Sequence, residues 1–300
     1  MNRPSALPSL ARLRSEWASL IIFSKREFII WNSYRMNAWM WFLDVLINTT
    51  VFFLLSLLTR GSGADFFPYG SDYVTFVVMG LCVHYISFTN FGDPYSRVAR
   101  IYWGGTMDLY LLSPLSYFTP MMGIMFRSVI DDYPRVILSI LFGGLLFGAV
   151  FHTAWLGLAA LFLLLTLLAT FGMGMVSASS FYLFNFKQQT EPVRFLFQDV
   201  IIALTAGYFY PLTVLPYPLQ ILGSFIPHTY ALDALRRLVV PGGDLVAPAL
   251  PLQHALPLSP LAVDGLVLAL MTLITLPLGW WMYVRGIEKA RREGTLTRWQ

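Results

Sequence analysis

The sequence predicts an all-α membrane protein with six transmembrane helices, an N-terminal amphipathic elbow helix and a re-entrant hairpin of half-helices between the fifth and sixth spans. Hydrophobic residues make up 57% of the chain and charged residues only 12%, whereas soluble domains contain about a quarter charged residues. The mean hydropathy is +0.63. Apolar segments long enough to cross a bilayer recur along the chain, which favours a bundle of helices.

The hairpin is predicted from residues 207–240, which stay apolar although prolines interrupt them. Each proline removes a backbone donor and disfavours helix at the residue before it, so a straight span cannot pass through this stretch. Broken helix at membrane depth is tolerated where protein or a wet cavity satisfies the freed backbone groups. We therefore expect short half-helices that enter and leave the outer leaflet on the same side. The interrupting prolines are Pro211, Pro216, Pro218 and Pro227.

The 300 residues predict one membrane domain with short flanking segments. Residues 1–36 form a cytosolic N-terminus in which apolar residues recur at helical spacing, as in an interfacial amphipathic helix or in a helix packed on other protein. Residues 37–285 hold the six spans, and residues 286–300 form a basic cytosolic tail. The single cysteine, Cys82, excludes an internal disulfide framework. The net charge of +4 does not indicate a nucleic-acid partner, and none is expected.

The first predicted span, Ala38–Leu58, carries a polar stripe. Asn37, Asp44 and Asn48 are spaced by seven and four residues, so they share one helical face. An ionisable residue inside a span faces the bundle or a wet cavity. This stripe either lines a substrate path or hydrogen-bonds to a neighbouring helix. The second span is predicted over 72–91.

The loop over 92–115 is polar enough to leave the bilayer. Pro94 and Pro114 frame a predicted short helix and a Gly104-Gly105-Thr106 break. Its aromatic and apolar face either docks into a groove on a partner or packs beneath the spans.

The third apolar region, 116–151, is 36 residues long, or about 54 Å as a helix, which is longer than one crossing needs. It contains Arg127, Asp131, Asp132 and Arg135. The pairs Arg127–Asp131 and Asp131–Arg135 are both four residues apart and can neutralise each other on one helix. We expect self-paired structural ions, with a proton relay or a cytosolic extension of the helix as alternatives.

The fourth span is predicted over 154–182, with small residues that allow close helix packing. The fifth begins near Phe195 and the sixth covers 261–284. With the N-terminus inside, fifteen of the twenty lysines and arginines fall on the inner side and three on the outer side. The positive-inside rule therefore predicts an inner or plasma membrane protein with both termini in the cytoplasm.

Three motifs, in their order and spacing relative to the spans, resemble those of the permease subunits of type-2 ATP-binding-cassette (ABC) exporters. Met107 and Asp108 stand where many relatives have leucine and glutamate. The resemblance covers nearly the whole chain. Its motifs are Arg100-x3-Gly104-Gly105-Thr106-x-Asp108-x-Tyr110-Leu111-Leu112-Ser113-Pro114-Leu115, Gly207-Tyr208-Phe209-Tyr210-Pro211-Leu212-x-Val214-Leu215-Pro216 and Pro227-His228-Thr229-Tyr230-Ala231-Leu232-x-Ala234-Leu235-Arg236.

The resemblance implies a homodimer, or a dimer with a similar permease, bound on its cytosolic side to ABC ATPase subunits. Those subunits would bind ATP and Mg, because this chain has no glycine-rich loop ending in Gly-Lys-Ser/Thr. Neither a cofactor nor a catalytic or metal-binding residue is expected in the chain itself. A coupling helix over 97–112 would contact the ATPase through Arg97, Arg100, Thr106, Asp108, Tyr110 and Leu112.

By the same analogy, a cavity between the first, second and fifth spans of the two permease copies would switch between inward and outward access. Its candidate lining residues are Asp44, Asn48, Asp199, Ile202 and Thr205. Candidate outer-gate residues are Gly207, Tyr208, Tyr210 and Pro211. The expected function is export of an amphipathic or hydrophobic substrate, such as a drug or lipid, from the cytoplasm. Polysaccharide and sodium export by similar permeases are alternatives.

Other classes of function are weighed against this expectation. An enzyme is disfavoured because the four histidines are scattered and form no HExxH pair. An ion-driven secondary transporter would use the Arg127–Arg135 cluster to couple protons. It would work without an ATPase and usually shows internal repeats, which the sequence lacks. A scaffold or sensor that binds the ATPase without transport is a third alternative.

Overall fold

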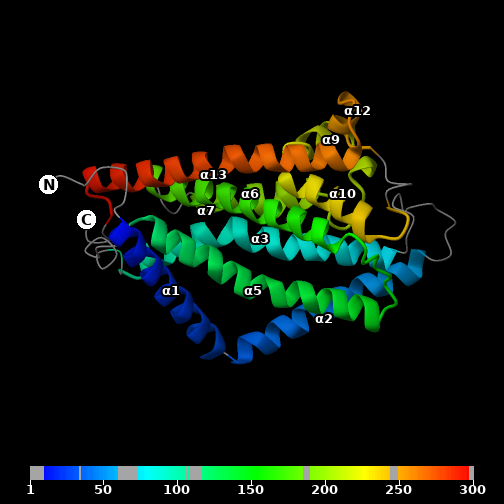
Figure 1. The fold of residues 1–300 in the computed structure, drawn as a ribbon, viewed down its shortest axis with the longest axis horizontal. Helices are drawn as coiled ribbons and strands as arrows, with labels where there is room; N and C mark the ends of the chain where they lie inside the picture. The colour runs from blue at the N-terminus through cyan, green and yellow to red at the C-terminus, as the bar shows by residue number, and fades with distance from the viewer. Residues whose placement is uncertain are drawn as a thin grey trace.

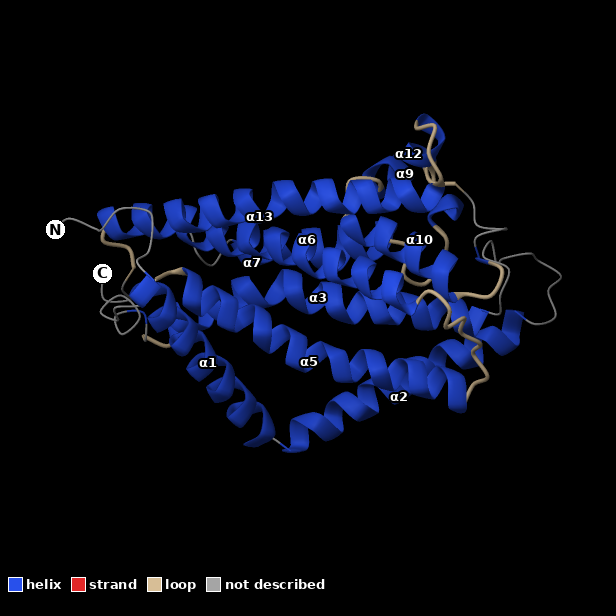
Figure 2. Ribbon diagram, in the orientation of Figure 1, coloured by secondary structure: helices blue, strands red, loops and turns tan. Residues whose placement is uncertain are grey.

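The structure, a computed structural model, describes residues 10–33, 35–59, 73–105, 107, 116–184, 190–243 and 249–296. These residues form helices and connecting turns without a strand (Figure 2). The helices are α1 (Leu10–Ser33), α2 (Arg35–Thr59), α3 (Tyr73–Trp103), α5 (Phe118–Leu145), α6 (Leu156–Leu183), α7 (Thr190–Phe195), the π-helix η2 (Leu196–Ile202), α8 (Ala203–Thr205), the 3-10 helix η3 (Leu212–Val214), α9 (Tyr217–Gly223), α10 (Pro227–Val239), α12 (Pro251–Ala255) and α13 (Pro260–Arg292).

Four of these helices are long and apolar enough to cross a membrane, so the chain is a helical membrane protein. They are α3, α6, α13 and the Trp39–Leu57 part of α2. The most apolar window of α3 is 83% buried, whereas that of α2 is only 17% buried. Figure 1 shows the reason: α3 lies between α5 and α6, α13 covers α6, and α2 leans against α5 at the edge of the bundle. The core is therefore built around α3.

Glycines let α6 pack closely on both of its neighbours. A Cβ at Gly172 would collide with the backbone of Thr275 and Leu276 on α13, and one at Gly174 would lie 2.9 Å from the Pro94 ring on α3. The Thr275 hydroxyl also donates to the Ala169 carbonyl at 3.1 Å. Small residues and hydroxyl bonds of this kind are typical of helix contacts in membranes, as the composition of this segment predicts.

The predicted helix end near Phe91 is wrong, because α3 continues through Pro94 to Trp103. A proline inside a helix frees the carbonyl four residues earlier, here that of Asn90. Gly174 has no side chain and so leaves room for the Asn90 carbonyl and for the proline ring. In the next turn of α3, Tyr95 and Val98 are buried. Tertiary packing thus maintains the helix where local preference disfavours it. The end of the predicted loop, residue 106 and residues 108–115, lies outside the described residues and includes Thr106, Asp108, Tyr110 and Leu112.

The last helix also extends beyond its predicted end at residue 284, because α13 continues to Arg292. Tyr283, Ile287 and Ala290 are buried on one face and prolong the apolar stripe into the segment predicted as a separate tail. Gly286 packs against the Ser179 carbonyl region of α6, and the Lys289 ammonium donates to the Leu183 carbonyl at 2.8 Å. The start of the basic tail is therefore part of the bundle.

Short helices occupy residues 207–240, which we call the hairpin, as the proline pattern predicts. Its re-entry into a membrane stays a prediction. The chain leaves α8 at Gly207, whose φ of +80° suits glycine. Pro216 and Pro227 stand at the starts of α9 and α10, where a missing backbone donor costs nothing. All residues of α10 are buried, and α10 packs on α3, α6 and α13 (Figure 1).

Candidate ligand cavity and buried ion network

A cavity of about 220 Å³ lies among α2, α3, α5 and the hairpin. The polar stripe of α2 faces it through Asp44 and Asn48, as one of the two interpretations of that stripe predicts. The remaining lining residues come mainly from α3 and are mostly aromatic. The full lining is Asp44, Asn48, Leu81, His84, Tyr85, Phe88, Thr89, Arg135 and Phe209.

Neutral groups hold the Asp44 carboxylate at the cavity. The Asn48 side-chain amide donates to Asp44 Oδ1 at 2.9 Å, and the Tyr85 hydroxyl donates to Asp44 Oδ2 at 3.4 Å. Asn48 also lies 3.5 Å from the Tyr85 hydroxyl. The stripe therefore hydrogen-bonds to α3 as well as lining the cavity, so both interpretations describe it. In the described part of the chain, Asp44 forms no ion pair.

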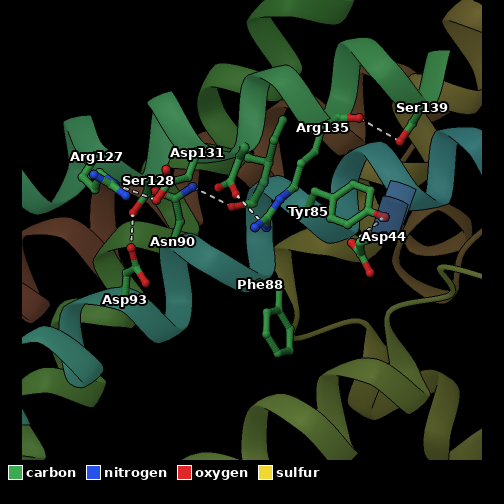
Figure 3. A network of polar contacts seen from close by, with 12 residues as sticks. Asp44, Tyr85, Phe88, Asn90, Asp93, Arg127, Ser128, Asp131, Arg135 and Ser139 are labelled. Atoms are coloured by element: carbon green, nitrogen blue, oxygen red, sulfur yellow. Dashed lines mark hydrogen bonds and ion pairs between the residues drawn. The ribbon is translucent and has the colours of Figure 1, made fainter. Parts of the chain in front are cut away.

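Arg135 of α5 reaches the other side of the cavity. Its guanidinium lies 4.8 Å from the Trp41 ring centroid and 5.8 Å from that of Tyr85. In Figure 3 the Tyr85 side chain stands between Arg135 and Asp44. The ion pair that the structure gives to Arg135 is with Asp132, at 3.7 Å. Arg135 thus joins α5 to the aromatic rings of α2 and α3.

The ion cluster on α5 is paired, but not entirely as predicted. Arg127 Nε lies 2.7 Å from Asp131 Oδ2, which confirms the first predicted pair. The predicted Asp131–Arg135 pair is wrong, because Asp131 binds Arg127 and the Arg135 guanidinium extends toward Trp41 and Asp132. Both aspartates are buried.

The network continues onto α3 (Figure 3). The Ser128 hydroxyl donates to Asp93 Oδ2 at 3.2 Å, and Arg97 Nε lies 3.6 Å from the same oxygen. Arg97, a predicted coupling residue, is therefore attached to α5 through Asp93. Arg100, one turn further along α3, is exposed. Whether either residue contacts an ATPase stays a prediction.

Asp199, Ile202 and Thr205, predicted to line a cavity, lie outside this one. Ile202 and Thr205 are buried, and Asp199 lies 3.8 Å from Arg194. Asp199 and Ile202 belong to the π-helix η2, and Thr205 belongs to α8. The analogy placed them in a cavity between two permease copies, and that role stays a prediction.

The predicted gate residues surround the break after α8. Gly207, Tyr208 and Pro211 are buried, and the Tyr210 hydroxyl donates to the Leu204 carbonyl. Arg236 of α10 donates to the carbonyls of Gly207 at 3.0 Å and Tyr208 at 2.9 Å. A gating role for these residues stays a prediction.

Arg236 also binds α3, which the sequence did not reveal. Its guanidinium lies 3.5 Å from the centroid of the Phe76 ring and 3.4 Å from the Phe76 carbonyl. A Cβ at Gly80, one turn later, would lie 1.9 Å from the Tyr208 carbonyl oxygen. The hairpin is therefore fixed directly to the central helix. In the sequence, Arg236 and Arg237 count among the outer-side charges, and Arg236 is also the last residue of the third motif.

Arg237 belongs to a second buried network at the same end. Its Nε lies 2.7 Å from Asp233 Oδ2. The Gln253 amide of α12 donates both to Asp233 Oδ2 and to Asp264 Oδ1, each at 2.7 Å. These contacts tie α10, α12 and α13 together, so that the end of the bundle beside the cavity is held by buried polar groups.

No group of three or more metal-binding side chains that could hold an ion occurs among the described residues. No protein-family model matches the sequence, and a search of curated proteins finds no significant match. The cavity and the polar groups around it are therefore the features that bear on function.

Proposed function

We propose that this chain is the membrane-spanning permease subunit of an ABC exporter. It moves an amphipathic or hydrophobic substrate out of the cytoplasm by alternating access, and a separate ATPase chain binds ATP and Mg. The observation that carries the proposal is the cavity beside Asp44. The cavity is bounded by α2 at the edge of the bundle, by the central helix α3 and by the hairpin with its interrupted helices. Such an arrangement can hold a substrate inside a helical bundle.

The proposed topology has six spans. α5 and the α7–η2–α8 segment would add two crossings to the four apolar helices. Paired charges on α5 make a crossing tolerable, because Arg127 and Asp131 neutralise each other. α1 would be the elbow helix at the inner interface, and the hairpin would re-enter the outer leaflet. The basic residues where α3 and α13 end, Arg100 and Arg285–Arg292, support the placement of that end in the cytoplasm.

Coupling to the ATPase would begin where α3 ends. At this end Tyr95, Val98 and Met107 pack with Met121 of α5 in one buried cluster. A push on the loop that follows α3 would reach both helices at once. Because α3 is continuous past Pro94, the displacement would pass to Tyr85 and Phe88 at the cavity.

A second permease copy would face the apolar surface of α2. Val51, Leu54 and Leu55 are exposed there, and Leu196 and Val200 are exposed on η2. Such surfaces suit lipid or another copy of the chain. The homodimer is proposed from the sequence resemblance, and these surfaces are compatible with it.

One observation favours an ion-coupled secondary transporter as a second candidate. Asp131 and Asp132 are buried side by side on α5, where carboxylates in transporters relay protons. The nearby Arg127 and Arg135 argue for a structural role instead, because each pairs with one of these carboxylates.

The deciding experiment is affinity purification of the full chain from its native membrane in mild detergent, followed by mass spectrometry and an ATPase assay. A stoichiometric nucleotide-binding subunit with vanadate-sensitive hydrolysis is the expected result. A solitary protein without ATPase activity in several gentle detergents would contradict the proposal and favour the ion-coupled transporter.

A further inference from the structure

We infer that the cavity beside Asp44 recognises a cation attached to an aromatic or apolar body. This inference rests on the proposed function in taking the cavity as the substrate site, and it adds the chemical class of the substrate. It is carried by three observations: the charge balance of the network, the aromatic walls of the cavity and the exposure of the Asp44 carboxylate.

The charge balance leaves Asp44 as the unmatched group. The ion cluster of α5, its continuation onto α3 and Asp44 together contain three arginines and four aspartates. Arg97 pairs with Asp93, Arg127 with Asp131 and Arg135 with Asp132. Asp44 receives hydrogen bonds only from the neutral groups of Asn48 and Tyr85 among the described residues. A carboxylate held only by neutral donors can form a charge-assisted hydrogen bond with a cationic ligand.

The walls suit a cation that carries a ring. Four of the nine lining residues have rings, namely His84, Tyr85, Phe88 and Phe209. Phe209 is itself stacked on Phe52 of α2, with centroids 4.6 Å apart. Aromatic faces attract cations within about 6 Å and also pack against apolar groups. A carboxylate beside such rings is the arrangement that binds organic ammonium groups.

Arg135 does not reverse this preference, although it also lines the cavity. Its charge is balanced by Asp132 at 3.7 Å, and its guanidinium lies over the Trp41 and Tyr85 rings. An anionic ligand would have to compete with these partners and would meet Asp44 across the Tyr85 ring (Figure 3). A cationic ligand meets an open carboxylate, since Asp44 is exposed.

The test is equilibrium dialysis of radiolabelled benzyltrimethylammonium with the purified full chain in lipid nanodiscs, with empty nanodiscs to subtract partitioning. Benzenesulfonate serves as the anionic probe with the same ring. We expect saturable binding of the cation and little binding of the anion. Asp44→Asn should weaken cation binding by at least about tenfold, because the variant loses the carboxylate that has no ion pair among the described residues. Glu293→Gln is the matched control, because it removes an exposed carboxylate where α13 ends and should leave binding unchanged.

Phe88→Leu provides a second variant that keeps the charge and the apolar surface. It should weaken cation binding severalfold through loss of the ring face. Preferred binding of benzenesulfonate, or equal cation binding by wild type and Asp44→Asn, would overturn the inference. If an ATPase co-purifies but the cation does not bind, the inference fails and the permease proposal stands. If the cation binds at Asp44 but no ATPase co-purifies, the site stands and the proposed function fails.

Discussion

Arg236 shows how one buried side chain can determine the shape of a whole segment. The turn after α8 exposes carbonyl groups that no helix satisfies, and the guanidinium donates to those of Gly207 and Tyr208. The same group lies against the Phe76 ring of α3. Arginine suits this position because its planar fork donates in several directions at once, which the ammonium group of lysine does not do.

Replacing Arg236 with methionine should therefore destabilise the protein by at least about 2 kcal/mol, because buried carbonyls lose their donors. Arg236→Lys should recover only part of the loss. Thermal unfolding of the purified variants in detergent, followed by intrinsic fluorescence, measures the effect. Arg285→Met is the control, since Arg285 is exposed on α13. An Arg236→Met protein as stable as this control would contradict the assigned role.

Part of the site could be predicted residue by residue, and part could not. Asp44 and Asn48 lie on a regular helix, so periodicity placed them on the correct face. Asp199 and Ile202 lie on a π-helix, which no periodicity in the sequence indicates. Arg135 and Phe209 reach the cavity from distant elements. Their roles depend on how the helices pack, which one sequence does not reveal.

At the scale of elements, glycine positions decide how closely the helices approach. Gly172 faces α13, and the Gly279 of α13 faces Gly172 in return. The sequence predicted close packing of this helix from its small residues, but not which helix lies on which side. The same close approach at Gly174 allows α3 to remain continuous at Pro94, a feature that local preference alone argues against.

Two glycine substitutions in α6 separate packing from helix propensity. Gly172→Ala should destabilise the protein, because the new Cβ collides with the backbone of α13. Gly157→Ala should be neutral or stabilise by about 0.5–1 kcal/mol, because no atom lies within 4 Å of its Cβ and alanine favours helix. Thermal unfolding of both variants under identical conditions tests the difference. Equal stabilities would mean that the α6–α13 contact is looser than described.

At the scale of the whole molecule, the proposed function requires that a displacement at the cytosolic end of the bundle reach the cavity. α3 extends from the cluster of Tyr95 and Val98 to the cavity residues Tyr85 and His84 without a break. A rigid helix of this kind passes a displacement along its length, whereas a loop at Pro94 would absorb it. A displacement at the Tyr95 end of α3 would therefore reach the cavity without a further helix or loop to transmit it.

Substitution of Asp108 or Tyr110 by alanine should uncouple ATP hydrolysis from transport while the protein still reaches the membrane. This prediction comes from the sequence motif after α3, because both residues lie outside the described part of the chain. Transport and vanadate-sensitive hydrolysis are measured in the same proteoliposomes, with membrane insertion as the control. Unchanged transport would count against a coupling helix over 97–112.

If the cavity binds a ligand as proposed, the attachment of the hairpin to α3 favours entry past α2. Phe209 follows Tyr208, whose carbonyl Arg236 holds, so this wall of the cavity does not swing away without losing a buried contact. α2 is largely exposed and meets α3 through hydrogen bonds around Asp44. Sideways motion of α2 would open an entrance toward the bilayer. Molecules that dissolve in lipid would then be selected before their charge is recognised.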